Sequence, residues 1–228
     1  MSKIGEGSTL AGFGAIAFSV LTVVGVAVGG APGGNYAASD VASYVAIGHL
    51  PTVIVTGYLA LFGVLGLICV FAYLRELISV DPAHKMAASV FWGTGLAAAA
   101  SMAVAWSFIT GIAVAAAEGG SSNPGNSVAA TVSSAETYTL SDTSINVLYG
   151  SGGFMLGFAL ISLMVASRGT LPGWLRWLSL VIGVLAIAAP AYFPSFAIPI
   201  WGLVIGGWLI ASGTSGAAVR SRAFDTMP

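Results

Sequence analysis

The sequence is poor in the residues from which disulfides, metal sites and soluble surfaces are built. It contains one cysteine and two histidines, and 7% of its residues are charged, whereas soluble domains carry about 25%. The single cysteine, Cys69, excludes an intramolecular disulfide, a CxxC redox pair and a multi-cysteine metal site. Because His49 and His84 leave almost no ligands for zinc or haem, we expect no metal and no cofactor.

The rest of the composition is typical of an integral membrane protein. Of the 228 residues, 57% are hydrophobic, which is too many for polar side chains to cover in water. The formal net charge of −1 gives no basic field for nucleic acid, so no nucleic-acid partner is expected. Membrane lipids are the expected surroundings.

Hydropathy divides the chain into six apolar segments, and a helix needs about 20 apolar residues to cross a bilayer core. Since each crossing segment must satisfy its own backbone hydrogen bonds, we predict an all-α bundle of six transmembrane helices, forming one membrane domain over residues 1–228. The first segment follows Lys3 as a signal peptide would. However, Glu6 and the poor cleavage site Ala27-Val28-Gly29 favour a retained helix. The predicted segments are 9–28, 49–74, 86–117, 144–166, 174–192 and 197–215.

The basic residues test this division independently, because hydropathy did not use them. With six spans, all seven fall on one side of the membrane and none lies in the core of a span: Lys3, Arg75, Lys85, Arg168, Arg176, Arg220 and Arg222. The other side holds acidic residues without Lys or Arg: Asp40, Glu118, Glu136 and Asp142. Positive-inside bias therefore predicts that the N- and C-termini are both cytoplasmic.

Two longer segments, 29–48 and 118–143, are predicted on the outer side. The first is glycine-rich and is expected to contain a short helix at 41–47. The second is rich in Ser, Thr, Gly and Asn, which suits a lid, a docking surface or plain disorder. The third span is too long for one crossing, so residues 108–117 are expected to project beyond the hydrocarbon.

Small residues are expected to bring the helices together, because burial of apolar surface drives little association in lipid. Three GxxxG pairs lie in apolar runs, and they serve either packing within the bundle or a face for a homo-oligomer or another subunit. The pairs are Gly25 with Gly29, Gly153 with Gly157, and Gly202 with Gly206.

A polar pocket open to the outside is the candidate binding site. His49, Thr52 and Thr56 share roughly one helix face, and other polar residues are expected at comparable depth. The alternative is an interfacial histidine bonded to backbone or water, with hydroxyls that bond back to their own helix. The candidate ligand-binding residues are His49, Thr52, Thr56, Tyr58, Asn146 and Tyr149.

No catalytic residue is predicted. No charged group lies in the middle of a span, which disfavours a carboxylate-based ion pump and excludes retinal binding through an intramembrane lysine. A serine hydrolase would use Ser151 as nucleophile, His49 as base and Asn146 at the oxyanion. That arrangement lacks the GxSG of rhomboid proteases, because position 149 is Tyr, and the last span has no histidine.

Two stretches carry a family resemblance. Residues 57–77 (from Gly-Tyr-Leu-Ala-Leu-Phe-Gly to Phe-Ala-Tyr-Leu-Arg-Glu-Leu) and 171–178 (Leu-Pro-Gly-Trp-Leu-Arg-Trp-Leu, then Gly183) resemble small six-helix membrane proteins of actinobacteria. The resemblance covers about a third of the chain. It implies a six-helix protein of the plasma (inner) membrane and supplies no catalytic residue from that largely uncharacterised group.

These features favour a non-catalytic membrane protein that works by association, as an accessory or scaffold subunit or as a lipid-facing structural component. Its expected partners are lipids and either a second copy of the chain or the subunits of a membrane complex. The alternative is a protein that binds or transports a small molecule or lipid through the outer pocket.

Overall fold

The structure, a computed structural model, describes residues 3–29, 44, 48–79, 82–120, 134–188 and 196–225. This part of the chain is helical throughout, apart from short turns, and contains no strand, which confirms the all-helical prediction. A 3₁₀ turn, Pro82–His84, precedes α4, and a π-helical turn, Val147–Gly152, joins α5 to α6. The helices are α1 (Lys3–Gly29), α3 (Leu50–Ile78), α4 (Lys85–Gly120), α5 (Ser134–Asn146), α6 (Gly153–Ala166), α7 (Gly173–Ile187) and α8 (Ala197–Asp225).

Four stretches are long and apolar enough to cross a membrane, which supports a membrane protein. They are Gly7–Gly29, Leu50–Ile78, Pro82–Ala115 and Ala135–Ala166. The last two predicted segments correspond to shorter apolar helices, Gly173–Ile187 and Ala197–Gly213.

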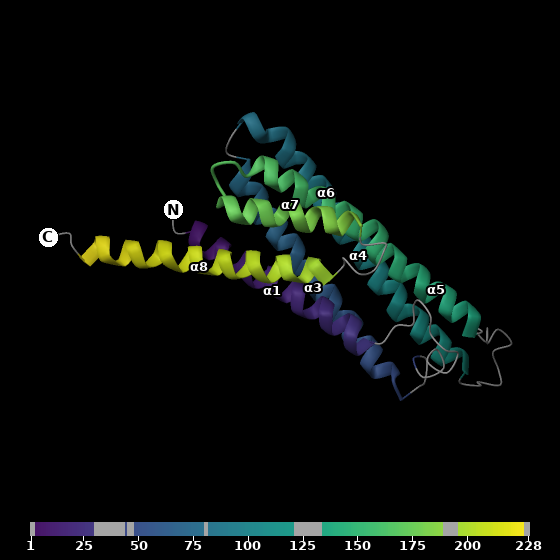
Figure 1. Cartoon of the computed structure of the whole chain (residues 1–228). Helices are drawn as coiled ribbons and strands as arrows, with labels where there is room; N and C mark the ends of the chain where they lie inside the picture. The colour runs from purple at the N-terminus through teal and green to yellow at the C-terminus, as the bar shows by residue number, and fades with distance from the viewer. Residues whose placement is uncertain are drawn as a thin grey trace.

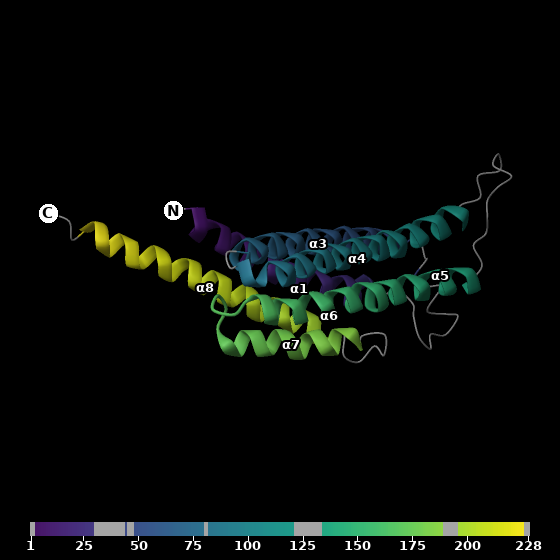
Figure 2. The ribbon, with the colours of Figure 1, turned by 90° about the horizontal axis from the view of Figure 1, so that it is seen from above.

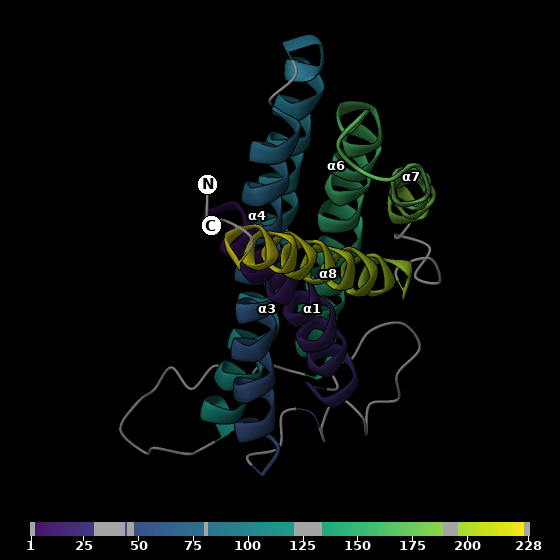
Figure 3. The ribbon, with the colours of Figure 1, turned by 90° about the vertical axis from the view of Figure 1, so that its left-hand side faces the viewer.

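α3, α4 and the stretch from α5 to α6 run along a common axis (Figures 1 and 3). α3 packs between α1 and α4, and α6 packs against α4 and carries α7 on its other side. α8 crosses α1 and also contacts α7 (Figures 1 and 3). Figure 2 shows α3 and α4 on one side of the bundle and α7 on the opposite side.

Pairs of glycines bring three of these helix pairs into backbone contact. A Cβ on residue 12 of α1 would lie 2.8 Å from the carbonyl oxygen of Gly206 in α8. A Cβ on Gly183 of α7 would lie 2.9 Å from the oxygen of Gly157 in α6. Gly14 and Gly66 join α1 to α3 in the same way. Close approach of this kind lets helices associate where lipid offers no hydrophobic driving force.

The predicted outer loop 118–143 differs from the structure at both ends. α4 continues to Gly120, and α5 is already helical from Ser134. A stripe of buried small polar side chains packs α5 against α4: Thr137, Ser141 and Ser144. The boundary at residue 144 came from low hydropathy, but a polar helix remains stable when one face is buried against a neighbour.

Other sequence predictions fall outside the described residues. Of the short helix predicted at 41–47, only Tyr44 is described, and its backbone is helical. Asp40 lies outside the described part, as do the side chains of Lys3, Glu118, Arg220 and Arg222.

Candidate functional site

The first half of the predicted polar pocket lies where α3 begins. The hydroxyl of Thr56 is buried and donates to the carbonyl oxygens of Thr52, at 2.7 Å, and Val53, at 3.1 Å. The Nε2 atom of His49 lies 3.4 Å from the carbonyl oxygen of Gly29, at the end of α1. The side chains of His49 and Thr56 therefore contact backbone oxygens, as expected if they are ordinary interfacial residues and do not line a ligand pocket.

Tyr44 ties this region to α4, a role that the sequence did not predict. Its hydroxyl donates to the carbonyl oxygen of Ile109 at 2.9 Å, and its ring centroid lies 6.3 Å from that of His49. Burial raises the pKa of Tyr44 above its usual range, so the hydroxyl stays protonated and remains a donor.

The other predicted pocket residues point elsewhere. Tyr58 is 60% exposed and faces the groove between α3 and α4. The side-chain amide of Asn146 donates to Asp142, to the backbone oxygen at 2.8 Å and to Oδ2 at 3.1 Å. Tyr149 lines a separate cavity of about 100 Å³, between α1, the π-helical turn and the start of α8. The cavities that Tyr58 and Tyr149 line are therefore different ones.

Ser151, considered as a nucleophile, is paired with another serine. Its Oγ lies 3.0 Å from the Oγ of Ser101 on α4. It belongs to the π-helical turn, a local widening that is frequent at functional sites. A Cβ on the adjacent Gly152 would lie 3.0 Å from the side chain of Met102, so the turn packs closely on α4.

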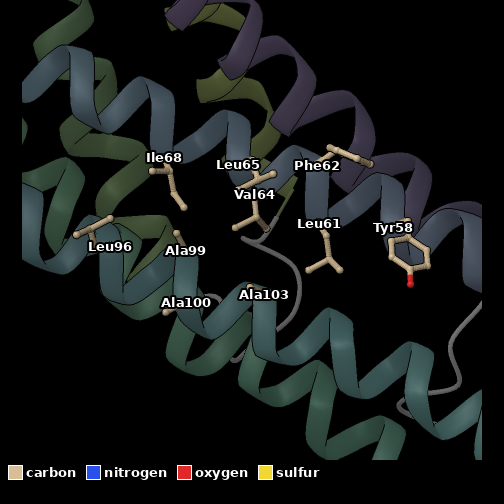
Figure 4. A pocket seen from close by; sticks show the side chains of 10 residues that line it. All are labelled: Tyr58, Leu61, Phe62, Val64, Leu65, Ile68, Leu96, Ala99, Ala100 and Ala103. Atoms are coloured by element: carbon tan, nitrogen blue, oxygen red, sulfur yellow. The ribbon is translucent and has the colours of Figure 1, made fainter.

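The α3–α4 groove is a carbon-lined cavity of about 500 Å³ (Figure 4). The side chains of α3 form one wall, and the alanines of α4 leave space opposite them. Tyr58 lies at one end of the lining and contributes its one polar side chain. The lining residues are Tyr58, Leu61, Phe62, Val64, Leu65, Ile68, Leu96, Ala99, Ala100 and Ala103.

One end of this groove leads to a cation. The guanidinium of Arg75 lies 5.2 Å from the ring centroid of Trp92, which is within the range of a cation–π contact. Arg75 follows Ile68 by seven residues on α3, and Trp92 precedes Leu96 by four on α4. Both spacings keep a residue on the same helix face, so Arg75 and Trp92 continue the two walls of the groove.

A third cavity, of about 440 Å³, lies between the far end of α4 and α5. It is lined by Ser107, Phe108, Gly111, Ile112, Ala115 and Leu140. Phe108 is 59% exposed and Leu140 is 47% exposed, so this helical pair presents an apolar surface.

The GxxxG glycines lie at interfaces within the chain. A Cβ on Gly25 would lie 2.8 Å from the Trp106 ring, and one on Gly29 would lie 3.1 Å from the Thr56 hydroxyl. Gly202 faces Ser19, and Gly206 and Gly157 make the backbone contacts described above. Gly153 is also buried, at the start of α6.

Comparisons of the chain with protein-family models, with curated proteins and with solved structures give no match. Within the described residues, no three His, Cys, Asp or Glu side chains gather as a metal site would require. The functional argument therefore depends on the surfaces and cavities of this chain alone.

Proposed function

We propose that the chain is a six-span protein of the plasma membrane, with both termini in the cytoplasm. In support, the α3–α4 turn and the α6–α7 turn lie at the same end of the bundle (Figure 1). The turns and the helix ends beside them carry four basic residues, Arg75, Lys85, Arg168 and Arg176. α5, with Glu136 and Asp142, lies at the opposite end. This separation of charge is the one that positive-inside bias favours.

On this topology, part of the α4–α5 pair projects from the outer face. α4 has 36 residues and is about 54 Å long, whereas the hydrocarbon core is about 30 Å thick. A crossing of about 20 residues that begins at Lys85 ends near Ala105, so Phe108 lies beyond it. A crossing that ends at Ala166 begins near Asn146, so α5 also lies outside.

The activity that we propose is association with another membrane protein or a second copy of the chain, as an accessory or scaffold subunit. The observation that carries it is the apolar cavity at Phe108 and Leu140, on a helical pair outside the hydrocarbon. An apolar surface exposed to water is stabilised when a partner protein covers it. The same surface facing lipid gains little from a partner, because lipid is itself apolar.

Native mass spectrometry of the protein, released gently from its own membrane, tests this function. The wild-type chain is expected in a defined assembly heavier than the monomer. Leu140→Lys should lower the assembled fraction about tenfold, because it places a charge in the apolar contact. The matched control is Thr143→Lys, an exposed position on the same helix that does not line the cavity, and it should leave the assembly intact. A wild-type monomer, or equal loss in both variants, would contradict association through this surface.

Binding of a small molecule is the second candidate. The cavity beside Tyr149 also contains Thr22, whose buried Oγ1 has no hydrogen-bond partner among the described residues. A hydroxyl in that position can bond to a ligand. In the same spectra, a monomer that retains one discrete small mass would favour this candidate.

A further inference from the structure

The α3–α4 groove combines an apolar surface with a positively charged end. Its walls are apolar from Leu61 to Ile68 on α3, and the alanines of α4 make it deep enough to hold a chain of methylenes. At the end away from Tyr58, the walls continue to Arg75 and Trp92. The groove is thus amphipathic along its length.

A second cation lies on the same face as Trp92. Lys85 precedes Trp92 by seven residues on α4, and its side chain is exposed. Seven residues make close to two helical turns, so Lys85 lies beyond Trp92 on the same stripe. Arg75 and Lys85 therefore place two positive charges at one end of the groove, and the walls from Leu61 to Ile68 carry no charge.

The contact of Arg75 with Trp92 leaves it able to bind an anion. A cation–π contact does not use up the five N–H donors of the guanidinium, so they can still donate to another group. A phosphate accepts two such hydrogen bonds in parallel. In a zwitterionic lipid the headgroup's own cation offsets the phosphate charge. An anionic lipid has no such cation, so it is the one whose net charge the protein's cations neutralise. Trp92 holds the guanidinium of Arg75 at this end of the groove, where a phosphate can meet it.

The part of the groove nearest Arg75 has the length of one acyl chain of a single leaflet. Leu65 precedes Arg75 by ten residues, which is about 15 Å along α3. Half of a hydrocarbon core of about 30 Å has the same length. A phosphate at Arg75 would thus lay its acyl chain along the groove as far as Leu65.

We infer that the α3–α4 groove binds one anionic glycerophospholipid from the cytoplasmic leaflet. Its phosphate pairs with Arg75 and Lys85, and one acyl chain lies against Leu65, Ile68 and Ala100. The inference rests on the proposed topology, which puts Arg75 at the cytoplasmic surface, but it does not require the proposed association at Leu140.

The test is native mass spectrometry of the full-length chain in micelles that contain equal amounts of phosphatidylglycerol and phosphatidylcholine. The wild-type chain should retain one phosphatidylglycerol about five times more often than one phosphatidylcholine. Arg75→Gln should lower this ratio to about one, whereas Arg168→Gln, an exposed arginine in the α6–α7 turn, should leave it unchanged.

A second pair of variants tests the acyl-chain site. Ala100→Trp should lower the retention of both lipids about fivefold by filling the groove. Val104→Trp, on an exposed part of α4 that does not line it, should not. Equal retention of the two lipids by the wild-type chain would overturn the inference, as would equal effects of the two arginine variants or of the two tryptophan variants. Because the mass of the protein assembly is read from the same spectra, failure of the association at Leu140 would be seen separately.

Discussion

Gly66→Leu is expected to destabilise the bundle by about 3 kcal/mol, because it separates α1 from α3. A Cβ on Gly14 would lie 2.7 Å from the carbonyl oxygen of Gly66, and a Cβ on Gly66 would contact the backbone of Gly14 even more closely. The obstacle in each direction is backbone, which cannot move aside as a flexible side chain can. The two helices would have to separate along their extensive contact.

The measurement is the midpoint of unfolding in a denaturing detergent titration, followed by circular dichroism. Gly93→Leu is the matched control, because nothing lies within 4 Å of a Cβ at that exposed position on α4. It should leave the midpoint unchanged or raise it slightly, since leucine has the higher helix propensity. Equal losses in the two variants would mean that the backbone contact of Gly14 with Gly66 is not what holds α1 to α3.

Trp201→Ala is expected to cost about 4 kcal/mol, the amount typical for removing a large core side chain. Trp201 is fully buried, and its Nε1 donates to the Oγ of Ser179 at 3.0 Å. Ser179 in turn donates to the carbonyl oxygen of Leu175 at 2.9 Å. This chain of hydrogen bonds links α8 to α7, so its loss should loosen both helices.

The same titration separates the contribution of Trp201 packing to stability from that of its hydrogen bond. Ser179→Ala removes the acceptor and leaves the indole N–H unpaired, which should cost about 1–3 kcal/mol. Trp174→Ala is the control for tryptophan content, because Trp174 is 56% exposed at the start of α7. A loss for Trp201→Ala no larger than for Trp174→Ala would show that α8 does not depend on this contact.

Hydropathy located the apolar parts of the helices but not their ends. The sequence predicted a third span longer than one crossing, and the structure has α4 of 36 residues. It missed α5, because a window of hydropathy measures affinity for lipid and not helix formation. The buried stripe that begins at Thr137 was visible only once a neighbouring helix was known to cover it.

The polar pocket was predicted from depth in the membrane, and depth does not fix the direction of a side chain. Thr56 and Tyr58 are two residues apart, which is about 200° around a helix, so they cannot share a face. Thr56 packs against Gly29, whereas Tyr58 faces the α3–α4 groove. Asn146 bonds to Asp142 on its own helix.

The α3–α4 groove left a signal in the sequence. Residues 58, 61, 65, 68 and 75 follow helical spacing on one face of α3, and the alanines at 99, 100 and 103 share a face of α4. The sequence interpretation used Arg75 only as a marker of topology. The register of α3 against α4, which brings Arg75 onto Trp92, depends on contacts between helices that one sequence does not contain.

The orientation of α3, α4 and α5, with the α3–α4 turn in the cytoplasm and α5 outside, is the claim on which both the outer association surface and the lipid site depend, and cysteine labelling tests it most directly. In a Cys69→Ser background, Thr139→Cys places one thiol on the exposed face of α5, and Ser79→Cys places one at the exposed end of α3. With a membrane-impermeant maleimide on intact cells, residue 139 should be labelled at once, and residue 79 only after the membrane is permeabilised. Labelling of residue 79 in intact cells, with residue 139 protected, would contradict the account.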